Sequence, residues 1–138
     1  MSTQIKICNC NQTMPLDAGA AAALAQACGA GQVQVSEMLC RREVGAYLTA
    51  LAAGEALIVG CTQERALFSE LAQNTATPLK FVNLRETAGW GRQGRQALPK
   101  MAALLAAAAL PDPEPVASVS YRSQGRLLIV GPASAALP

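Results

Sequence analysis

Four of the five cysteines in this chain occur where a predicted strand gives way to a predicted helix. They are Cys8, Cys10, Cys40 and Cys61, whereas Cys28 falls near the end of a predicted helix. In a reducing compartment, cysteines serve as metal, cluster or redox ligands before they serve as disulfide partners. In an open α/β sheet, the carboxyl ends of the parallel strands lie along the same edge, so residues far apart in the sequence can converge there. These positions therefore predict a thiolate-rich site.

The chain contains no histidine, which restricts the chemistry of such a site. Ser-His-Asp and Cys-His nucleophile systems, histidine general bases and histidine metal ligands are all excluded. Four convergent thiolates suit a [4Fe–4S] cluster or a zinc ion with four cysteine ligands. The spacing is neither the ferredoxin C-x₂-C-x₂-C run nor the paired C-x₂-C of a zinc ribbon. A metal-free domain for thiol-redox chemistry or small-molecule binding is the third interpretation.

The segments that must position the cysteines alternate between strand and helix. Short apolar or alternating stretches predict strands over residues 4–8, 32–36, 57–60 and 79–83. Helices are predicted from Pro15 to Gly29, over 41–53, after Thr62 and over 96–109. This alternation predicts an α/β fold with a parallel sheet of about four strands and right-handed crossovers, in a three-layer Rossmann-like or flavodoxin-like sandwich.

All four cysteines of the site are predicted at the carboxyl edge of that sheet. Helices that begin near Pro15, Arg41 and Thr62 are expected to direct free N–H groups and positive dipole ends toward the sulfurs. Arg41 and Arg42 are expected to add positive charge beside Cys40. Cys28 should lie at the opposite edge, more than about 15 Å away, because a helix rises about 1.5 Å per residue.

Two regions are expected along the chain. Residues 1–110 form the α/β domain that carries the cysteines, and residues 111–138 form a Pro-rich linker with a β-hairpin. The hairpin is predicted from the strand-like segments 116–121 and 126–130, and this region is expected to begin a further part of a longer protein.

Composition excludes several classes of function. The net charge of +2 is too small, and the Lys and Arg residues too scattered, to indicate a nucleic-acid partner. The N-terminus lacks the apolar core of a signal peptide, and the longest apolar stretch, 101–110, is too short to span a bilayer. A cytoplasmic location without a membrane span is therefore expected.

The order and spacing of several short motifs resemble those of a known family. The motifs are Cys8-Asn-Cys10-Asn11, Leu39-Cys40, Val59-Gly-Cys61-Thr-Gln-Glu-Arg65, and Asn83-Leu-Arg85-Glu86 with Trp90 shortly after. Together they cover roughly residues 5–108 and resemble the N-terminal iron–sulfur domain of heterodisulfide reductase A subunits and related 4Fe-4S ferredoxin-type proteins. The resemblance implies one [4Fe–4S] cluster on Cys8, Cys10, Cys40 and Cys61.

The same resemblance places Arg85, Glu86 and Trp90 beside the cluster, as cofactor-binding residues after the fourth strand. Trp90 is expected to shield the cluster, to contact a partner or to anchor its own loop. Arg85 and Glu86 are expected to form an ion pair. A phosphate site at Arg92, Gly94 and Arg95 is a further interpretation. The family usually continues into a flavin-binding domain, but only the first glycine of that motif, Gly131, is present here, so no flavin is predicted.

The function expected from the sequence is electron transfer through one [4Fe–4S] cluster within a larger oxidoreductase. Its partners would be redox domains or subunits. A structural Zn(Cys)₄ module and a metal-free thiol-redox or small-molecule-binding domain are the alternatives. The sequence leaves open whether the domain catalyses any reaction alone.

Overall fold

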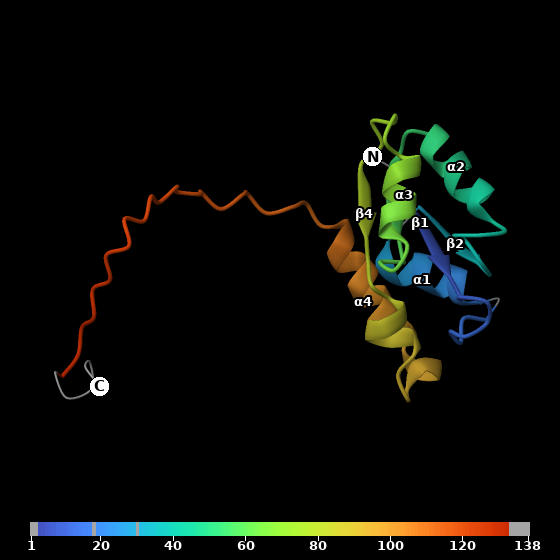
Figure 1. Ribbon diagram of the computed structural model, residues 1–138. Helices are drawn as coiled ribbons and strands as arrows, with labels where there is room; N and C mark the ends of the chain where they lie inside the picture. The colour runs from blue at the N-terminus through green and yellow to red at the C-terminus, as the bar shows by residue number, and fades with distance from the viewer. Residues whose placement is uncertain (1–2, 18, 30, 133–138) are drawn as a thin grey trace.

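The computed structural model describes residues 3–17, 19–29 and 31–132 of the chain. Four parallel strands form one sheet in the order β2-β1-β3-β4 (Figure 1). Their bounds are Thr3–Cys8 for β1, Gln32–Ser36 for β2, Ala56–Val59 for β3 and Leu79–Phe81 for β4. The predicted α/β fold, with a Rossmann-like or flavodoxin-like parallel sheet, is confirmed.

Helices cover both faces of the sheet (Figure 1). Helices α1 (Ala20–Cys28) and α4 (Leu98–Ala109) contribute to the core on one face, and α2 (Val44–Ala52) and α3 (Arg65–Leu71) to the core on the other. Successive side chains of a strand point to opposite faces, so β1 serves both cores. Its Ile5 and Ile7 are buried against α1 and α4, whereas Cys8 is buried with the residues of α2 and α3.

Three helices begin later than the sequence predicts. Helix α1 starts at Ala20 rather than at Pro15, α2 at Val44 rather than at residue 41, and α3 at Arg65. The residues before α1 and α2 instead form turns with their own hydrogen bonds. The Asp17 carboxylate accepts the Gly19 N–H at 2.9 Å, and the Met38 carbonyl accepts the Arg41 N–H at 3.0 Å. Cys8 therefore ends β1, and Cys10, Cys40 and Cys61 lie in connecting loops rather than in the first turns of the helices.

The connection from β4 to α4 is a pair of short helical turns. A π-helical turn, η1 (Arg85–Gly89), is followed by a 3₁₀ turn, η2 (Gly94–Gln96). Two glycines let these turns pack closely. A Cβ on Gly89 would collide with the Met14 sulfur, and one on Gly94 would collide with the Gly89 carbonyl oxygen. The two turns thus form a tight cover over the segment that follows β1.

Residues 111–132 extend away from the α/β domain (Figure 1) and form no strand within the part of the chain that the structure describes. The predicted hairpin over 116–121 and 126–130 is therefore wrong. Both segments are exposed, and an isolated two-stranded hairpin is marginally stable in water unless it packs on another element. Lys80 anchors the start of the extension through an ion pair with Asp112 at 2.9 Å. Residues 133–138 of this region lie outside the described residues.

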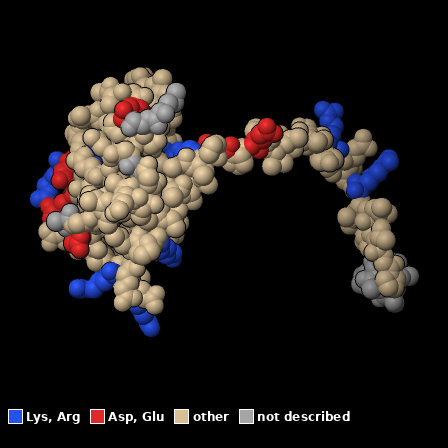
Figure 2. All heavy atoms as spheres, turned by 180° about the vertical axis from the view of Figure 1, so that it is seen from behind, with Lys and Arg blue, Asp and Glu red and all other residues tan. Residues whose placement is uncertain are grey.

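Charge is dispersed over the molecule. On the face shown in Figure 2, basic and acidic side chains are interspersed, and no broad patch of one sign is visible. Among the described helices, none is long and apolar enough to cross a membrane.

Candidate functional site

The register of the sheet brings the ends of three strands to one edge. Cys8, the last residue of β1, pairs with Ser36, the last residue of β2, and Lys6 of β1 pairs with Val59, the last residue of β3. The order β2-β1-β3-β4 reverses direction between β1 and β3. Open α/β sheets bind ligands outside the carboxyl ends of their strands at such a reversal. The loops that carry the cysteines begin at this point.

All four cysteines of the predicted site line one pocket of about 180 Å³ at this edge. Cys8 comes from the end of β1, and Cys10, Cys40 and Cys61 come from the loops after β1, β2 and β3. The fifth cysteine, Cys28, does not line the pocket. Cys28 ends α1, where its thiol lies 3.6 Å from the Ala102 carbonyl oxygen. The other residues that line this cysteine pocket are Asn11, Met38, Leu39, Arg41, Glu64, Phe68 and Arg85.

The four thiols surround the pocket without forming a compact ligand cluster. Across residues 3–17, 19–29 and 31–132, no three His, Cys, Asp or Glu side chains are grouped so that they could hold one metal ion. Zinc binds thiolate sulfur at about 2.3 Å, so four ligands would have to stand within about 4 Å of one another. A single ion would therefore require the thiols to move closer together.

Cys8 is the most buried of the four, and its sulfur accepts two backbone N–H groups. The donors are Cys10 at 3.2 Å and Leu39 at 3.4 Å. A hydrogen bond from the Cys10 thiol, together with these amides, lowers the pKa of Cys8 to about 6, against the opposing effect of burial. The Glu37 carbonyl oxygen, 3.1 Å from the same sulfur, accepts a hydrogen bond from the protonated thiol and so also opposes ionisation. The net effect favours a thiolate at Cys8.

The pKa of Cys10 shifts in the opposite direction. Its hydrogen bond to Cys8 raises the pKa of Cys10, and the nearby Arg85 guanidinium only partly offsets this. The two sulfurs therefore share one proton in the metal-free chain. The sequence predicts that N–H groups in the first turns of helices donate to the cysteine sulfurs. The two amides that donate to the Cys8 sulfur belong to loop residues instead.

The loop after β1 has an unusual backbone. Cys10, Asn11 and Gln12 have φ angles of 52°, 57° and 66°, so three consecutive residues other than glycine are left-handed. Each such residue costs about 1–2 kcal/mol relative to the right-handed form. Hydrogen bonds hold the loop in this shape. The Asn11 N–H donates to the Glu37 carbonyl at 2.7 Å, and the Gln12 N–H donates to Asn9 Oδ1 at 2.9 Å.

Strained backbone that the surrounding contacts hold in place is typical of functional sites. Here the left-handed turn allows the Cys10 N–H to reach the Cys8 sulfur while Cys10 itself lines the same pocket. Of the three residues, only Asn11 belongs to a type that favours this conformation.

Charged groups of both signs surround the pocket. Arg41 and Arg85 line it, as does Glu64. Burial raises the pKa of Cys40, and its electrostatic interactions with Glu64, Cys8 and Cys61 raise it further. Arg42, expected beside Cys40, instead forms an ion pair with Glu37 at 3.0 Å. Two arginines and one glutamate therefore line the pocket.

Arg85, Glu86 and Trp90 occupy different positions relative to the pocket. Arg85 lines it, forms the expected ion pair with Glu86, and lies over the Trp90 ring at 4.3 Å from the ring centre. Trp90 lines a second, larger pocket, and its indole N–H donates to Thr13 Oγ1 at 3.1 Å. Neither Glu86 nor Trp90 lines the cysteine pocket.

Sequence reasoning missed the apolar part of the wall, which Met38, Leu39 and Phe68 form. Phe68 and Leu39 are almost fully buried. In the sequence, Leu39 stands out only because it precedes Cys40, and Phe68 only because it lies on the apolar side of a helix. Ordinary core residues occupy such positions as well, so neither position indicates a pocket. Comparisons with protein-family models, curated proteins and solved structures find no match to this chain.

Proposed function

We propose that this chain is an electron-transfer domain that holds one [4Fe–4S] cluster on Cys8, Cys10, Cys40 and Cys61, within a larger redox protein. One observation carries the proposal. Four thiols, from the end of β1 and from the loops after β1, β2 and β3, line a single pocket at the reversal of strand order, and the fifth thiol does not. The motif resemblance to the iron–sulfur domain of heterodisulfide reductase A subunits supports the same ligand set.

The dimensions of the site favour a cluster over one ion. A [4Fe–4S] cluster is bulkier than a zinc ion, and its cysteine ligands stand further apart. The thiols line a pocket of about 180 Å³ and are not grouped tightly enough, among the described residues, to hold one metal ion. A cluster therefore requires less rearrangement of the loops than a Zn(Cys)₄ site.

The surroundings of the thiols suit an anionic cluster. Two arginines line the pocket against one glutamate, and two amides donate to the Cys8 sulfur. Hydrogen bonds to ligand sulfurs and limited solvent exposure set the reduction potential of such centres. The buried Leu39 and Phe68 exclude water from one side. When bound, the cluster would supply one-electron chemistry, and the partners would be redox domains or subunits, in the cytoplasm.

A second candidate function rests on the Cys8–Cys10 pair alone. A thiolate at Cys8, with its pKa near 6 and a neighbouring thiol at Cys10, resembles the arrangement of dithiol redox proteins. In that function a disulfide substrate would be reduced to two thiols. Cys8 and Cys10 would form a disulfide and supply the two electrons, while the Cys10 thiol would supply one proton and water the other.

Anaerobic reconstitution with ferrous iron and sulfide separates the two functions. A cluster gives broad visible absorbance, and its reduced form gives an electron paramagnetic resonance signal. Both should survive in Cys28→Ser and disappear in Cys61→Ser. The dithiol function is favoured instead if reconstitution gives no such spectrum and mass spectrometry of the oxidised chain finds a Cys8–Cys10 disulfide that reduces reversibly.

A further inference from the structure

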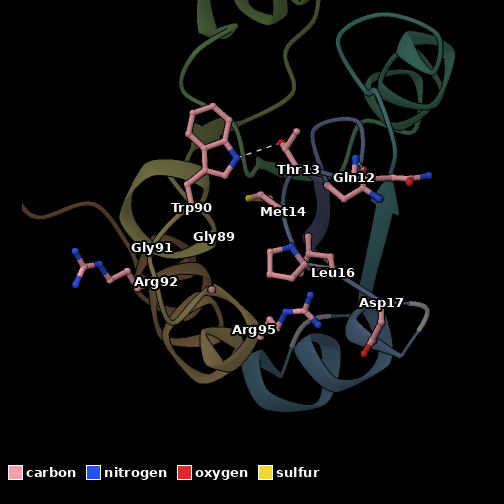
Figure 3. Close-up of a pocket in the computed structure, with 13 residues that line it drawn as sticks. Gln12, Thr13, Met14, Leu16, Asp17, Gly89, Trp90, Gly91, Arg92 and Arg95 are labelled. Carbon is pink, nitrogen blue, oxygen red and sulfur yellow. Dashed lines mark hydrogen bonds between the residues drawn. The ribbon is translucent and has the colours of Figure 1, made fainter.

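A second, larger pocket (Figure 3) is lined in part by the loop that follows β1. Its volume of about 860 Å³ is within the range of small-molecule sites. We call it the Trp90 pocket. The segment from Asn9 to Asp17 forms one side, and the segment from Gly89 to Arg95 forms the other. Cys10 and Asn11 line the cysteine pocket while Gln12 and Thr13 line this one, so a single loop separates them.

An aromatic ring is fixed at one end of the Trp90 pocket. The indole of Trp90 donates to Thr13 Oγ1 at 3.1 Å (Figure 3). The Arg85 guanidinium lies over the ring. Despite both contacts, 53 % of Trp90 remains exposed. Ring–ring contacts are favourable when the partner ring stacks with an offset or meets it edge to face. An indole held on two sides can accept such a partner with little loss of conformational entropy.

A cationic group lies at the other end. In Figure 3, Arg95 reaches from η2 toward the segment that contains Leu16 and Asp17, whereas Arg92 points away from the pocket. The described part of the chain offers Arg95 no hydrogen-bond or ion-pair partner. Asp17 uses one carboxylate oxygen to accept the Gly19 N–H. A guanidinium presents a planar fork of donors that matches a phosphate group.

The floor between the two ends is apolar. Met14 and Leu16 are buried, and Pro15 also lines the pocket. The opposite side is held by the contacts of Gly89 with Met14 and of Gly94 with the Gly89 carbonyl, which leave no space for a side chain. The pocket is therefore largely preformed.

We propose that the Trp90 pocket binds a small ligand in which a planar ring is joined to a phosphate group, as in a nucleoside phosphate. The ring packs against Trp90, and the phosphate pairs with Arg95. Met14 and Leu16 contact the part of the ligand in between. This site is independent of any metal, although a ligand bound there is separated from the cysteine pocket only by the loop at Cys10–Thr13 and by Arg85.

The fluorescence of Trp90 offers a direct test because it is the only tryptophan in the chain. The metal-free chain of 138 residues is titrated with AMP, with adenosine and with inorganic phosphate. AMP should change the fluorescence saturably and bind at least about tenfold more tightly than adenosine, since a charge-assisted hydrogen bond contributes roughly 1.5 kcal/mol or more. Phosphate alone should bind more weakly than AMP.

Matched variants identify the phosphate contact. Arg95→Gln should weaken AMP about tenfold and leave adenosine unchanged. Arg122→Gln, which removes the same charge from the exposed extension, should change neither. Equal binding of AMP and adenosine, equal effects of the two variants, or no saturable signal up to about 10 mM AMP would each overturn the proposal. Calorimetry on the iron-reconstituted chain, with iron content measured separately, distinguishes failure of this site from failure of the cluster.

Discussion

The guanidinium of Arg85 lies 4.3 Å from the centre of the Trp90 ring, and this contact joins the two pockets of the domain. Arg85 lines the cysteine pocket, and Trp90 lines the larger one. The π-helical turn explains how residues five apart meet, because the Arg85 carbonyl accepts the Trp90 N–H at 2.8 Å across that turn. Such turns are rare and occur frequently at functional sites.

Replacing Arg85 with Gln should lower the reduction potential of the reconstituted cluster. Reduction adds negative charge, which a nearby guanidinium stabilises, and Arg85 also interacts with Cys10. The ion pair with Glu86 limits the effect, so a decrease of roughly 20–60 mV is expected for a one-electron couple. Redox titration followed by visible absorbance measures it.

Arg92→Gln is the matched control, since Arg92 belongs to the same connection but does not line the cysteine pocket. An equal shift in both variants would mean that overall charge, rather than the position of Arg85, sets the potential. No shift in either would contradict the assigned role of Arg85.

The stability of the reduced, metal-free chain should depend on pH through Cys8. The pKa of Cys8 is about 6 when folded and 9.0 as the ordinary value, so between these limits the unfolded chain binds the extra proton. Unfolding free energy should therefore rise as pH increases from about 6 to about 9. Above pH 9, the raised pKa values of Cys10 and Cys40 act in the opposite direction, because the folded state retains protons that the unfolded state releases.

Urea unfolding at a series of pH values under reducing conditions measures this dependence. Cys8→Ser should flatten the rise between pH 6 and pH 9, whereas Cys28→Ser should preserve it. A rise of the same slope in Cys8→Ser would show that another group is responsible.

Gly94→Ala should destabilise the domain by about 1–3 kcal/mol, because the added methyl group has no space beside the Gly89 carbonyl. Gly45→Ala is the control within helix α2, where a Cβ meets nothing within 4 Å. There the better helix propensity of alanine should leave stability unchanged or raise it by up to about 1 kcal/mol. Denaturant unfolding of both variants measures the free energy of unfolding. A Gly94→Ala variant as stable as Gly45→Ala would refute the tight packing of η1 against η2.

Much of the fold was predictable because strand and helix periodicities differ strongly along residues 4–109. The apolar run at Leu57–Val59 and the end of α1 at Gly29, whose φ is 62°, are examples. The common edge for Cys8, Cys40 and Cys61 followed from parallel topology. Helix starts were predicted too early because turns such as the one at Asp17 use the same capping residues as helices do.

Two features of the site depend on tertiary contacts that no local pattern reveals. The left-handed turn at Cys10–Gln12 is stabilised by the distant Glu37 carbonyl, and the approach of Arg85 to Trp90 depends on a π-helical turn. The hairpin prediction failed for a related reason. Strand-like residues at 126–130 form a strand only where a sheet is present to receive them, and none receives them among the described residues.

Iron and sulfide quantification after anaerobic reconstitution tests the cluster assignment most directly. The wild-type chain and Cys28→Ser should each hold about four irons and about four sulfides, and Cys40→Ser should hold far fewer of both. Wild-type protein that retains less than about one iron per chain, or Cys40→Ser that retains as much iron and sulfide as the wild type, would contradict a [4Fe–4S] cluster on these four cysteines.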